Sequence, residues 1–307
     1  MSKNYYIIPV FISHQGCPHQ CVFCNQDRIA GVYDEVTAED VRERIDSYLD
    51  TMNTKNSTIE VSFFGGTFTA IPVIKQKELL AVAREYKNKG LIHKIRLSTR
   101  PDAINGYILS YLKEFKVDII ELGVQSLDDN VLRLAGRGHS AYDVENASRL
   151  IKAEGFTLGH QIMPGLPGDT KEIDLATIKK SIEMKPDIAR IYPALVIKDT
   201  PMETMYNRGE YEPYSLDMAV EVSREMLKLY NAAKVKVIRI GLQPTDTIAE
   251  GKDVVAGPFH PAFRELVEGS LICENIKEKT NESSDIIIEI NSKDISKLYC
   301  NKKQYFN

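Results

Sequence analysis

Residues Tyr5–Cys24 read YYIIPVFISHQGCPHQCVFC and join an apolar run to a short loop that carries cysteines. Cys17, Cys21 and Cys24 have CxxxCxxC spacing, in a chain of 307 residues with only five cysteines. A loop this short can direct three sulfur atoms at three corners of one [4Fe-4S] cube. The fourth iron then lacks a cysteine and stays open to another ligand. The spacing therefore favours catalysis over simple electron transfer.

Zinc and a disulfide are the alternative uses of these cysteines. Zinc binds four tetrahedral Cys or His ligands, so His14 or His19 could complete the set. Structural zinc sites usually contain paired CxxC motifs, however, and Cys273 and Cys300 stand alone. Residues Met1–Tyr6 contain no apolar secretory leader, which predicts a cytoplasmic chain. In that compartment clustered cysteines usually bind metal or catalyse, so we expect the cluster, then zinc, then disulfides.

The composition is that of an ordinary globular protein. With 43% apolar and 27% charged residues over 307 positions, the chain can bury a large core. The length allows one domain of barrel size or two smaller ones. No apolar run approaches the length of a membrane span, so none is expected. The net charge of -4 means that any nucleic-acid contact needs a local basic patch.

Short runs rich in β-branched residues alternate with longer segments in which apolar residues recur at helical spacing. Thr37 and Asp40 resemble a capping box at the start of the first such segment. Six βα units and a closing strand imply an α/β fold with a parallel sheet curved into a full or partial barrel. The expected strands are Tyr5–Ile12, Ile59–Phe64, Ile92–Ser98, Ile119–Val124, Thr157–Met163, Ile188–Tyr192 and Val235–Ile240.

Polar and glycine-rich segments follow several of these strands. In such folds the chemistry collects at the carboxyl ends of the strands, where the cysteine loop also lies. Gly65–Thr67 follows the second strand and either lets the backbone approach a ligand or makes a tight turn. Gly165–Gly168 follows the fifth strand as a bend, and Asp169 or Thr170 can cap the next helix. Gln125, after the fourth strand, is a weaker candidate.

Two arginines belong to the same set of loops. Arg137 lies between glycines, so its forked donors are accessible and could hold a carboxylate. The neighbouring His139 is expected at the surface or at a helix start. Arg100 ends the third strand and either has a function or pairs with Asp102.

Together these motifs resemble the radical SAM superfamily. Its cysteine pattern carries an aromatic residue just before the last cysteine, a position that Phe23 holds. The resemblance implies a partial (β/α)6 barrel with an extra closing strand and a [4Fe-4S] cluster on Cys17, Cys21 and Cys24. It also implies S-adenosylmethionine as cofactor, its amino group near Gly66. The residues implied to bind cofactor are Phe23, Gly65, Gly66, Thr67, Ser98, Arg100, Gln125, Arg137, Gln161, Gly165 and Leu166.

Within the superfamily, residues 5–265 are most similar to the catalytic subunit of Elongator and its bacterial and archaeal relatives. The likeness is carried by the segments Ser98–Asp102, Glu121–Asp128, Gly136–His139, Ile162–Gly168 and Ile191–Ile197. The Elongator subunit has a basic tRNA-binding extension before its barrel and an acetyltransferase domain after it. The first strand here begins at Tyr5, and only residues 266–307 follow the barrel. We therefore expect a short, stand-alone relative that lacks both parts.

The resemblance implies that one electron from the cluster cleaves S-adenosylmethionine to methionine and a 5′-deoxyadenosyl radical, which abstracts hydrogen from a substrate. A flavodoxin or ferredoxin would supply the electron. The expected substrate is RNA, either tRNA or rRNA, with no DNA and no membrane. A small molecule, such as a porphyrin or an acyl thioester, is the alternative, as is a non-catalytic metal protein that binds RNA. No residue is assigned to the step after radical formation.

The tail completes the predicted organisation, a core barrel over residues 1–265 and a C-terminal α/β extension over 266–307. Residues 274–284 are polar and predict a linker, and Asp285–Ile290 predicts a strand. Ile295–Lys303 resembles the turn of a KH-like RNA module, with Cys300 and Lys303 where that module has glycines. This degenerate motif leaves open whether the tail contacts RNA or only packs.

Overall fold

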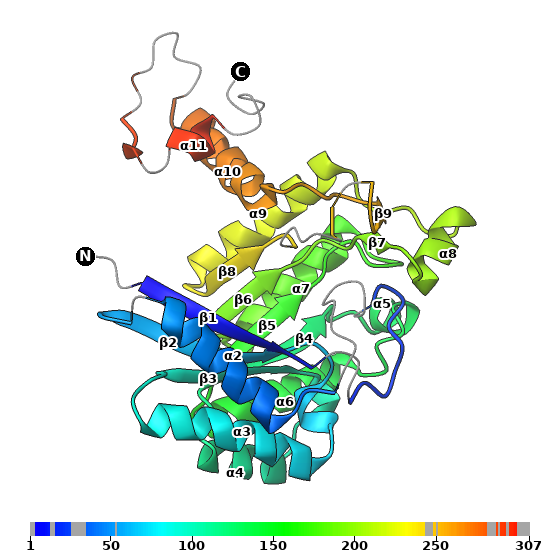
Figure 1. Cartoon of the computed structure of the whole chain (residues 1–307). Helices are drawn as coiled ribbons and strands as arrows, with labels where there is room; N and C mark the ends of the chain where they lie inside the picture. Colours follow the sequence, from blue (N-terminus) through cyan, green and yellow to red (C-terminus); the bar gives the residue numbers. More distant parts are fainter. Residues whose placement is uncertain are drawn as a thin grey trace.

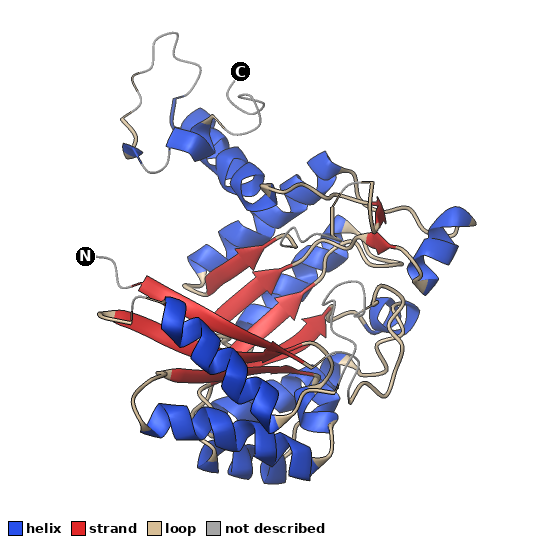
Figure 2. Cartoon of the chain, in the orientation of Figure 1, coloured by secondary structure: helices blue, strands red, loops and turns tan. Residues whose placement is uncertain are grey.

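Seven parallel strands form one curled sheet with helices packed along it (Figures 1 and 2). The computed structural model describes residues 4–12, 16–25, 35–52, 54–242, 248–249, 251–280, 287, 289–292 and 295–299. The strand order is β1-β2-β3-β4-β5-β6-β8, so neighbours in the sheet follow one another along the chain. This order leaves β1 and β8 as the two edges of the sheet, and confirms the predicted partial barrel.

All seven predicted strands are present. Their bounds are β1 Asn4–Phe11, β2 Ser57–Phe64, β3 Lys94–Thr99, β4 Ile119–Gln125, β5 Thr157–Ile162, β6 Ile188–Ile191 and β8 Lys236–Ile240. The helices are α2 Ala38–Thr51, α3 Val73–Asn88, α4 Gly106–Glu114, α5 Asp129–Leu134, α6 Ala141–Ala153, α7 Lys171–Glu183, α8 Pro201–Asn207, α9 Leu216–Ala232, α10 Phe263–Thr280 and α11 Ile295–Leu298, with short 3-10 turns at Phe68–Ala70 and Pro101–Ala103.

Local sequence signals explain where these elements begin and what they bury. The predicted capping box opens α2, because Thr37 Oγ1 accepts from the Asp40 amide at 3.2 Å and Asp40 accepts from the Thr37 amide at 2.7 Å. Val41 and Ile45 on that helix are fully buried, as the helical spacing predicts. Alternate strand residues such as Val61 face the same core. The other face of each strand lines the inside of the curl.

A small antiparallel pair at the carboxyl rim was not predicted. Val196–Ile197 (β7) pairs with Val254–Ala256 (β9), more than fifty residues later. The two strands are too short to show a sequence period, and their pairing depends on distant parts of the chain. The pair covers the region beyond the ends of β6 and β8 (Figure 1).

The prediction of a linker over residues 274–284 is wrong for residues 274–280, the part that the structure describes. Helix α10 continues to Thr280, because its polar residues make one exposed face while Cys273 on the other face is 5% exposed. Glu274 is also held by Lys228 of α9, at 2.9 Å. The predicted boundary at residue 265 lies inside this helix, so the division into two domains stays a prediction.

Little of the predicted strand and KH-like turn falls within the described residues. Ile287, Glu289 and Ile290 have no regular secondary structure there. Cys300 and Lys303 lie outside the described residues. Among the helices that the structure describes, none is both long enough and apolar enough to cross a membrane.

Candidate active site

The cysteine loop lies at the carboxyl ends of the strands, beside α5 (Figure 1). The Ile12 amide donates to the Phe64 carbonyl at 2.7 Å, which extends the pairing of β1 with β2 just before the loop. Within the loop, the Cys24 amide donates to the Cys21 carbonyl at 3.1 Å and closes a tight turn. Cys21 is buried, Cys24 is half-buried and Cys17 is exposed. The parallel sheet thus puts the predicted ligands at the expected rim.

Two distant elements hold this loop through its backbone. The Val22 amide donates to Ala135 at the end of α5, at 3.1 Å, and the Val22 carbonyl accepts from Met202 in α8, at 2.9 Å. Phe23 packs on the apolar cluster that contains Leu166. The cysteine loop and the loop after β5 therefore share one apolar support.

The glycine turn after β2 contacts the cysteine loop directly. Gly65 and Gly66 have φ of +75° and +53°, a region that glycine enters without the penalty of a Cβ. Thr67 is fully buried, and its Oγ1 lies 3.3 Å from Cys17 Sγ. Opposite it, a Cβ on Gly16 would lie 2.4 Å from the Thr67 carbonyl oxygen. The two segments approach so closely that only glycine fits between them.

Arg137 reaches the buried cysteine. Its Nη1 donates to Cys21 Sγ at 3.2 Å, and its Nη2 donates to the Gly123 carbonyl at 2.6 Å. The guanidinium thus ties the buried cysteine to the backbone of β4. The sequence predicted an accessible arginine for a carboxylate; in the structure Arg137 is buried and bound to a cysteine.

Arg100 supports Arg137 and pairs with its own neighbour. Its guanidinium donates to both carboxylate oxygens of Asp102 at 2.9 Å and to the Arg137 carbonyl at 2.5 Å. Burial alone would raise the pKa of Asp102, but the hydrogen bonds and charge of Arg100 outweigh it and lower that pKa. The pairing that the sequence left open is therefore present.

His139 directly precedes Ser140, the N-cap of α6, as the helix-start alternative predicted, but it does not lie at the surface. The side chain is 5% exposed, with Nε2 3.3 Å from the Val124 carbonyl oxygen. Burial, followed by the charges of Arg137 and Arg100, lowers the pKa of His139 to about 3. The imidazole is therefore neutral near pH 7. A glycine–arginine–glycine context predicted exposure, but the segment packs against the cysteine loop instead.

The remaining candidates line the inside of the curl. Gln125 has a φ of +65° and is 5% exposed, and its buried Oε1 has no hydrogen-bond partner in the described structure. Ser98 and Gln161 are partly exposed on β3 and β5. Gln161 lies opposite Gly123 in the register of β4 and β5. Polar side chains thus face the space beside the cysteine loop.

Zinc was one alternative for these cysteines, and His14, a candidate zinc ligand, lies outside the described residues. Among the described residues, no three His, Cys, Asp or Glu side chains lie together as they would around one metal ion. Zn–S bonds of about 2.3 Å in a tetrahedron need sulfurs about 3.8 Å apart, whereas a [4Fe-4S] cube takes each sulfur on a separate iron. None of the four described cysteines is in a disulfide.

Two family models match this chain. A model described as the radical SAM superfamily matches residues 11–179, and one described as the radical SAM C-terminal domain matches residues 186–272. The chain belongs to the radical SAM superfamily. It is therefore a radical SAM enzyme, as the cysteine spacing and the two glycine segments predicted.

The relatives of this radical SAM enzyme include Elongator-type proteins. It is 30% identical over 255 residues to the tRNA uridine(34) acetyltransferase of Methanocaldococcus infernus, covering 70% of this chain and 48% of the relative. It is 26% identical over 268 residues to the human Elongator complex protein 3, covering 73% of this chain and 49% of the relative. The chain thus spans about half the length of these relatives.

A solved structure agrees with this relationship. The Elp3 protein of Methanocaldococcus infernus, with an N-terminal deletion, superposes with a TM-score of 0.70 at 25% identity. The match covers 92% of this chain and 65% of that one. It confirms the curled sheet of the radical SAM fold and the predicted Elongator-like resemblance.

Membership of the superfamily implies a [4Fe-4S] cluster and S-adenosylmethionine, and the residues present fit both. Three cysteines on one loop, none of them in a disulfide, can ligate three irons, and Arg137 donates to Cys21 Sγ. The backbone at Gly65 and Gly66 is open to a ligand because neither residue has a side chain. Gln125 Oε1 is a buried acceptor without a donor, in the same region.

Two tyrosines that sequence reasoning missed hold the loop after β5. Tyr211 donates to the Gly165 carbonyl at 2.6 Å, and Tyr214 donates to Asp174 Oδ2 at 2.9 Å. A Cβ on Gly165 would lie 2.9 Å from the Tyr214 ring, so this glycine has to remain bare. The only sequence signal was a pair of tyrosines just ahead of α9.

A carboxyl pair lies under the same loop. Burial raises the pKa of Asp169 to about 6, and burial together with the charge of Asp169 raises the pKa of Asp174 well above its usual value. Asp169 Oδ2 is buried without a donor, and a proton shared with Asp174 supplies one. Thr170 caps α7, as predicted, by accepting from the Ile173 amide at 3.3 Å.

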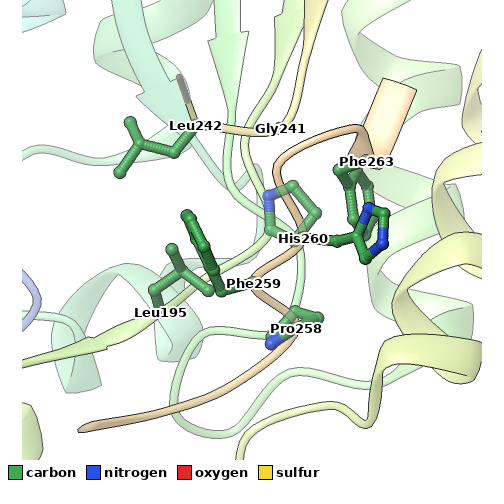
Figure 3. Close-up of a pocket in the computed structure, with 8 residues that line it drawn as sticks. Leu195, Gly241, Leu242, Pro258, Phe259, His260 and Phe263 are labelled. Carbon is green, nitrogen blue, oxygen red and sulfur yellow. The ribbon is translucent and has the colours of Figure 1, made fainter. Parts of the chain in front are cut away.

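A small hollow occupies the rim beyond the ends of β6 and β8. It begins at Gly241, directly after β8, and its apolar lining includes Leu195, Leu242 and Phe259 (Figure 3). His260 also lines it, with its Nδ1 accepting from the Ala262 amide at 3.1 Å. The segment between β9 and α10 therefore contributes to the same rim as the cysteine loop.

Proposed function

We propose that Cys17, Cys21 and Cys24 bind a [4Fe-4S] cluster, that S-adenosylmethionine binds at its open corner, and that the enzyme modifies RNA, either tRNA or rRNA. The observation that carries this proposal is the convergence of distant motifs on one loop. Thr67 lies against Cys17 at 3.3 Å and Arg137 against Cys21 at 3.2 Å. When bound, the reduced cluster supplies the electron that cleaves S-adenosylmethionine to methionine and a 5′-deoxyadenosyl radical.

The protein's own residues would bind and orient the cofactors. The Gly65 and Gly66 backbone would contact the amino group of S-adenosylmethionine, and Thr67 would keep this turn against Cys17. Leu166, which is 2% exposed, would support the adenine from the loop after β5. Ser98, Gln125, Gln161 and Arg100 would complete the cofactor site, and Phe23 would shield the cluster from water because it packs on the apolar cluster with Leu166.

RNA is the proposed substrate because of the relatives. Two of the proteins described above are a tRNA uridine(34) acetyltransferase and an Elongator complex protein. The chain covers about half of each, so we transfer only the substrate class, not the acetyl transfer. The electron would come from a flavodoxin- or ferredoxin-type donor, since the reaction consumes one electron per cleavage.

The cofactor half is tested by Cys21→Ala after anaerobic reconstitution with iron and sulfide. We expect this variant to stay folded but to lose most of its iron and its release of 5′-deoxyadenosine from S-adenosylmethionine with dithionite. Cys273→Ala is the matched control, because Cys273 is also buried but lies in α10. Full iron and cleavage in Cys21→Ala would rule out the assigned ligand set.

The substrate half is tested by mass spectrometry of nucleosides from total RNA of a deletion strain and its parent. We expect one modified nucleoside to disappear on deletion and to return with the wild-type gene, but not with Cys21→Ala. Identical nucleoside profiles, together with intact S-adenosylmethionine cleavage by the purified protein, would exclude RNA and indicate a small-molecule substrate.

A further inference from the structure

The inside of the curled sheet carries a row of buried charges. Arg96 on β3 donates to Glu60 at 2.9 Å and to Glu121 at 3.1 Å. Glu121 on β4 also accepts from Arg190 on β6 at 2.8 Å. All four side chains are at most 9% exposed. Buried charges need partners, and here each arginine is matched by a carboxylate.

Arg239 extends this row onto the last strand. The register pairs Arg190 with Arg239, after a one-residue shift between β6 and β8. On β8, Val237 and Ile240 pair with Ala189 and Ile191, and all four belong to the core cluster. The register shift between those two pairs leaves Arg239 beside Arg190 on the inner face. Neighbouring strands lie about 4.8 Å apart, so the backbones of these two arginines are adjacent.

The two arginines differ in how they are satisfied. Arg190 donates to Glu121 and to the Tyr192 hydroxyl, the latter at 3.0 Å. Arg239 is partly exposed and makes no ion pair within the described ranges of the chain. Like charges on paired residues of one face repel, and an anion bound to both would relieve the repulsion. On these strands the inner face therefore carries one more arginine than carboxylates: Arg96, Arg190 and Arg239 against Glu60 and Glu121.

The position of Arg239 matches that of a substrate contact. In the register, Arg239 is opposite Arg190, Arg190 is opposite Gln161, and Gln161 is opposite Gly123. The Gly123 carbonyl accepts from Arg137, which also holds Cys21. Arg239 therefore lies three strand spacings from Gly123, or roughly 14 Å along the sheet. β8 is an edge strand of the sheet, and Arg264 of α10 donates to the Val237 carbonyl on it at 3.4 Å.

We propose that Arg239, together with Arg190, binds an oxyanion of the substrate, a phosphate group where that substrate is RNA. A guanidinium is suited to this role, because its forked donors match two oxygens of a phosphate. That the anion is an RNA phosphate rests on the proposed function. The existence of an anion site at these two arginines does not.

The first test measures binding of labelled total tRNA by fluorescence anisotropy over a salt series. We expect Arg239→Ala to weaken binding about tenfold, and to reduce the slope of log affinity against log salt by about 0.7 to 0.9. Arg239→Lys should lose less tRNA affinity than Arg239→Ala, since lysine keeps the positive charge but lacks the forked donors of a guanidinium. Lys236→Ala is the matched control, an exposed cation on the same strand, and should bind as the wild type does. Equal binding by Arg239→Ala and wild type would overturn the proposal.

The second test does not depend on RNA. Phenylglyoxal modifies accessible arginines, and mass spectrometry measures the extent at Arg239 with and without inorganic pyrophosphate. We expect pyrophosphate to slow modification of Arg239 several-fold and to leave the exposed Arg133 unchanged. Protection without tRNA binding by the wild type would support this site while removing RNA as the substrate. No protection of Arg239 would refute the site even if tRNA binds.

Discussion

Arg137 shows how one side chain links the cysteine loop to the sheet. Its guanidinium bridges Cys21 Sγ and the Gly123 carbonyl, and its own carbonyl accepts from Arg100. Arg100 is in turn held by Asp102. A hydrogen bond from a positive group to a ligating sulfur would tune the reduction potential of the cluster that the sulfur holds.

Replacing Arg137 should change the potential of the reconstituted cluster. In Arg137→Met the loss of a charged hydrogen bond disfavours the more negative, reduced cluster, so the reduction potential should fall by on the order of 60 mV. A redox titration followed by electron paramagnetic resonance measures this shift. Arg133→Met, an exposed change on α5, should leave the potential unaltered. A potential that does not move in Arg137→Met would contradict the role given to its hydrogen bond.

At the scale of elements, the site depends on loops that meet without belonging to one segment. The loop after β1 rests on the turn after β2, on the end of α5 and on the start of α8. Gly16 lies where the loop after β1 meets the turn after β2, and its φ is +73°. Its missing side chain lets two backbones come into contact.

We expect Gly16→Ala to lose iron binding while the sheet remains folded. The new Cβ would lie 2.4 Å from the Thr67 carbonyl oxygen and 2.8 Å from the Ile71 nitrogen, both backbone atoms that cannot turn away. The matched control is Gly155→Ala, with a φ of +83° but no atom within 4 Å of the new Cβ. The control should lose only about 1 kcal/mol of stability and keep its iron. Iron content after reconstitution and thermal unfolding measure the two effects, and full iron in Gly16→Ala would count against this packing.

At the scale of the whole molecule, segments far apart in the chain hold the inside and the rim together. The inner ion pairs join β2, β3, β4 and β6. Tyr211 and Tyr214, which precede α9, hold the loop after β5 and Asp174 in α7. The carboxyl pair beneath that loop links the stability of the whole chain to pH.

The pair should make the protein less stable as pH rises. The pKa of Asp169 is about 6 in the folded state against 3.8 as a model value, so the folded state binds more protons. The free energy of unfolding should therefore fall as pH rises from about 4 through about 6, by up to about 3 kcal/mol for a shift of this size.

Asp174→Asn should remove this dependence, because the amide donates to Asp169 without needing a proton. Chemical denaturation at about pH 5 and about pH 8 should show a smaller difference in this variant than in the wild type. The control Asp50→Asn, at an exposed carboxylate on α2, should keep the wild-type difference. An unchanged difference in Asp174→Asn would show that another group is responsible.

Much of the fold followed from signals within a few residues. The β-branched runs predicted all seven strands of the sheet, and Thr37 with Asp40 predicted the start of α2. The error over 274–280 has a local cause as well, since a polar stretch on the exposed face of a helix resembles a linker. Cysteine spacing and glycine turns predicted which loops come together at the carboxyl ends of the strands, because both depend on the reach of a short backbone.

The contacts within the site could not be read from the amino acids, because they join residues distant in the chain. Arg137 lies 116 residues after Cys21, and Arg190 lies 69 residues after Glu121. Only strand order, register and curl bring such pairs together, since they decide which side chains share the inner face and at what level. The chain's motifs therefore determined the chemistry that the site supports. The tertiary structure decided which side chains surround it, because burial and charge pairing act between strands and not along one.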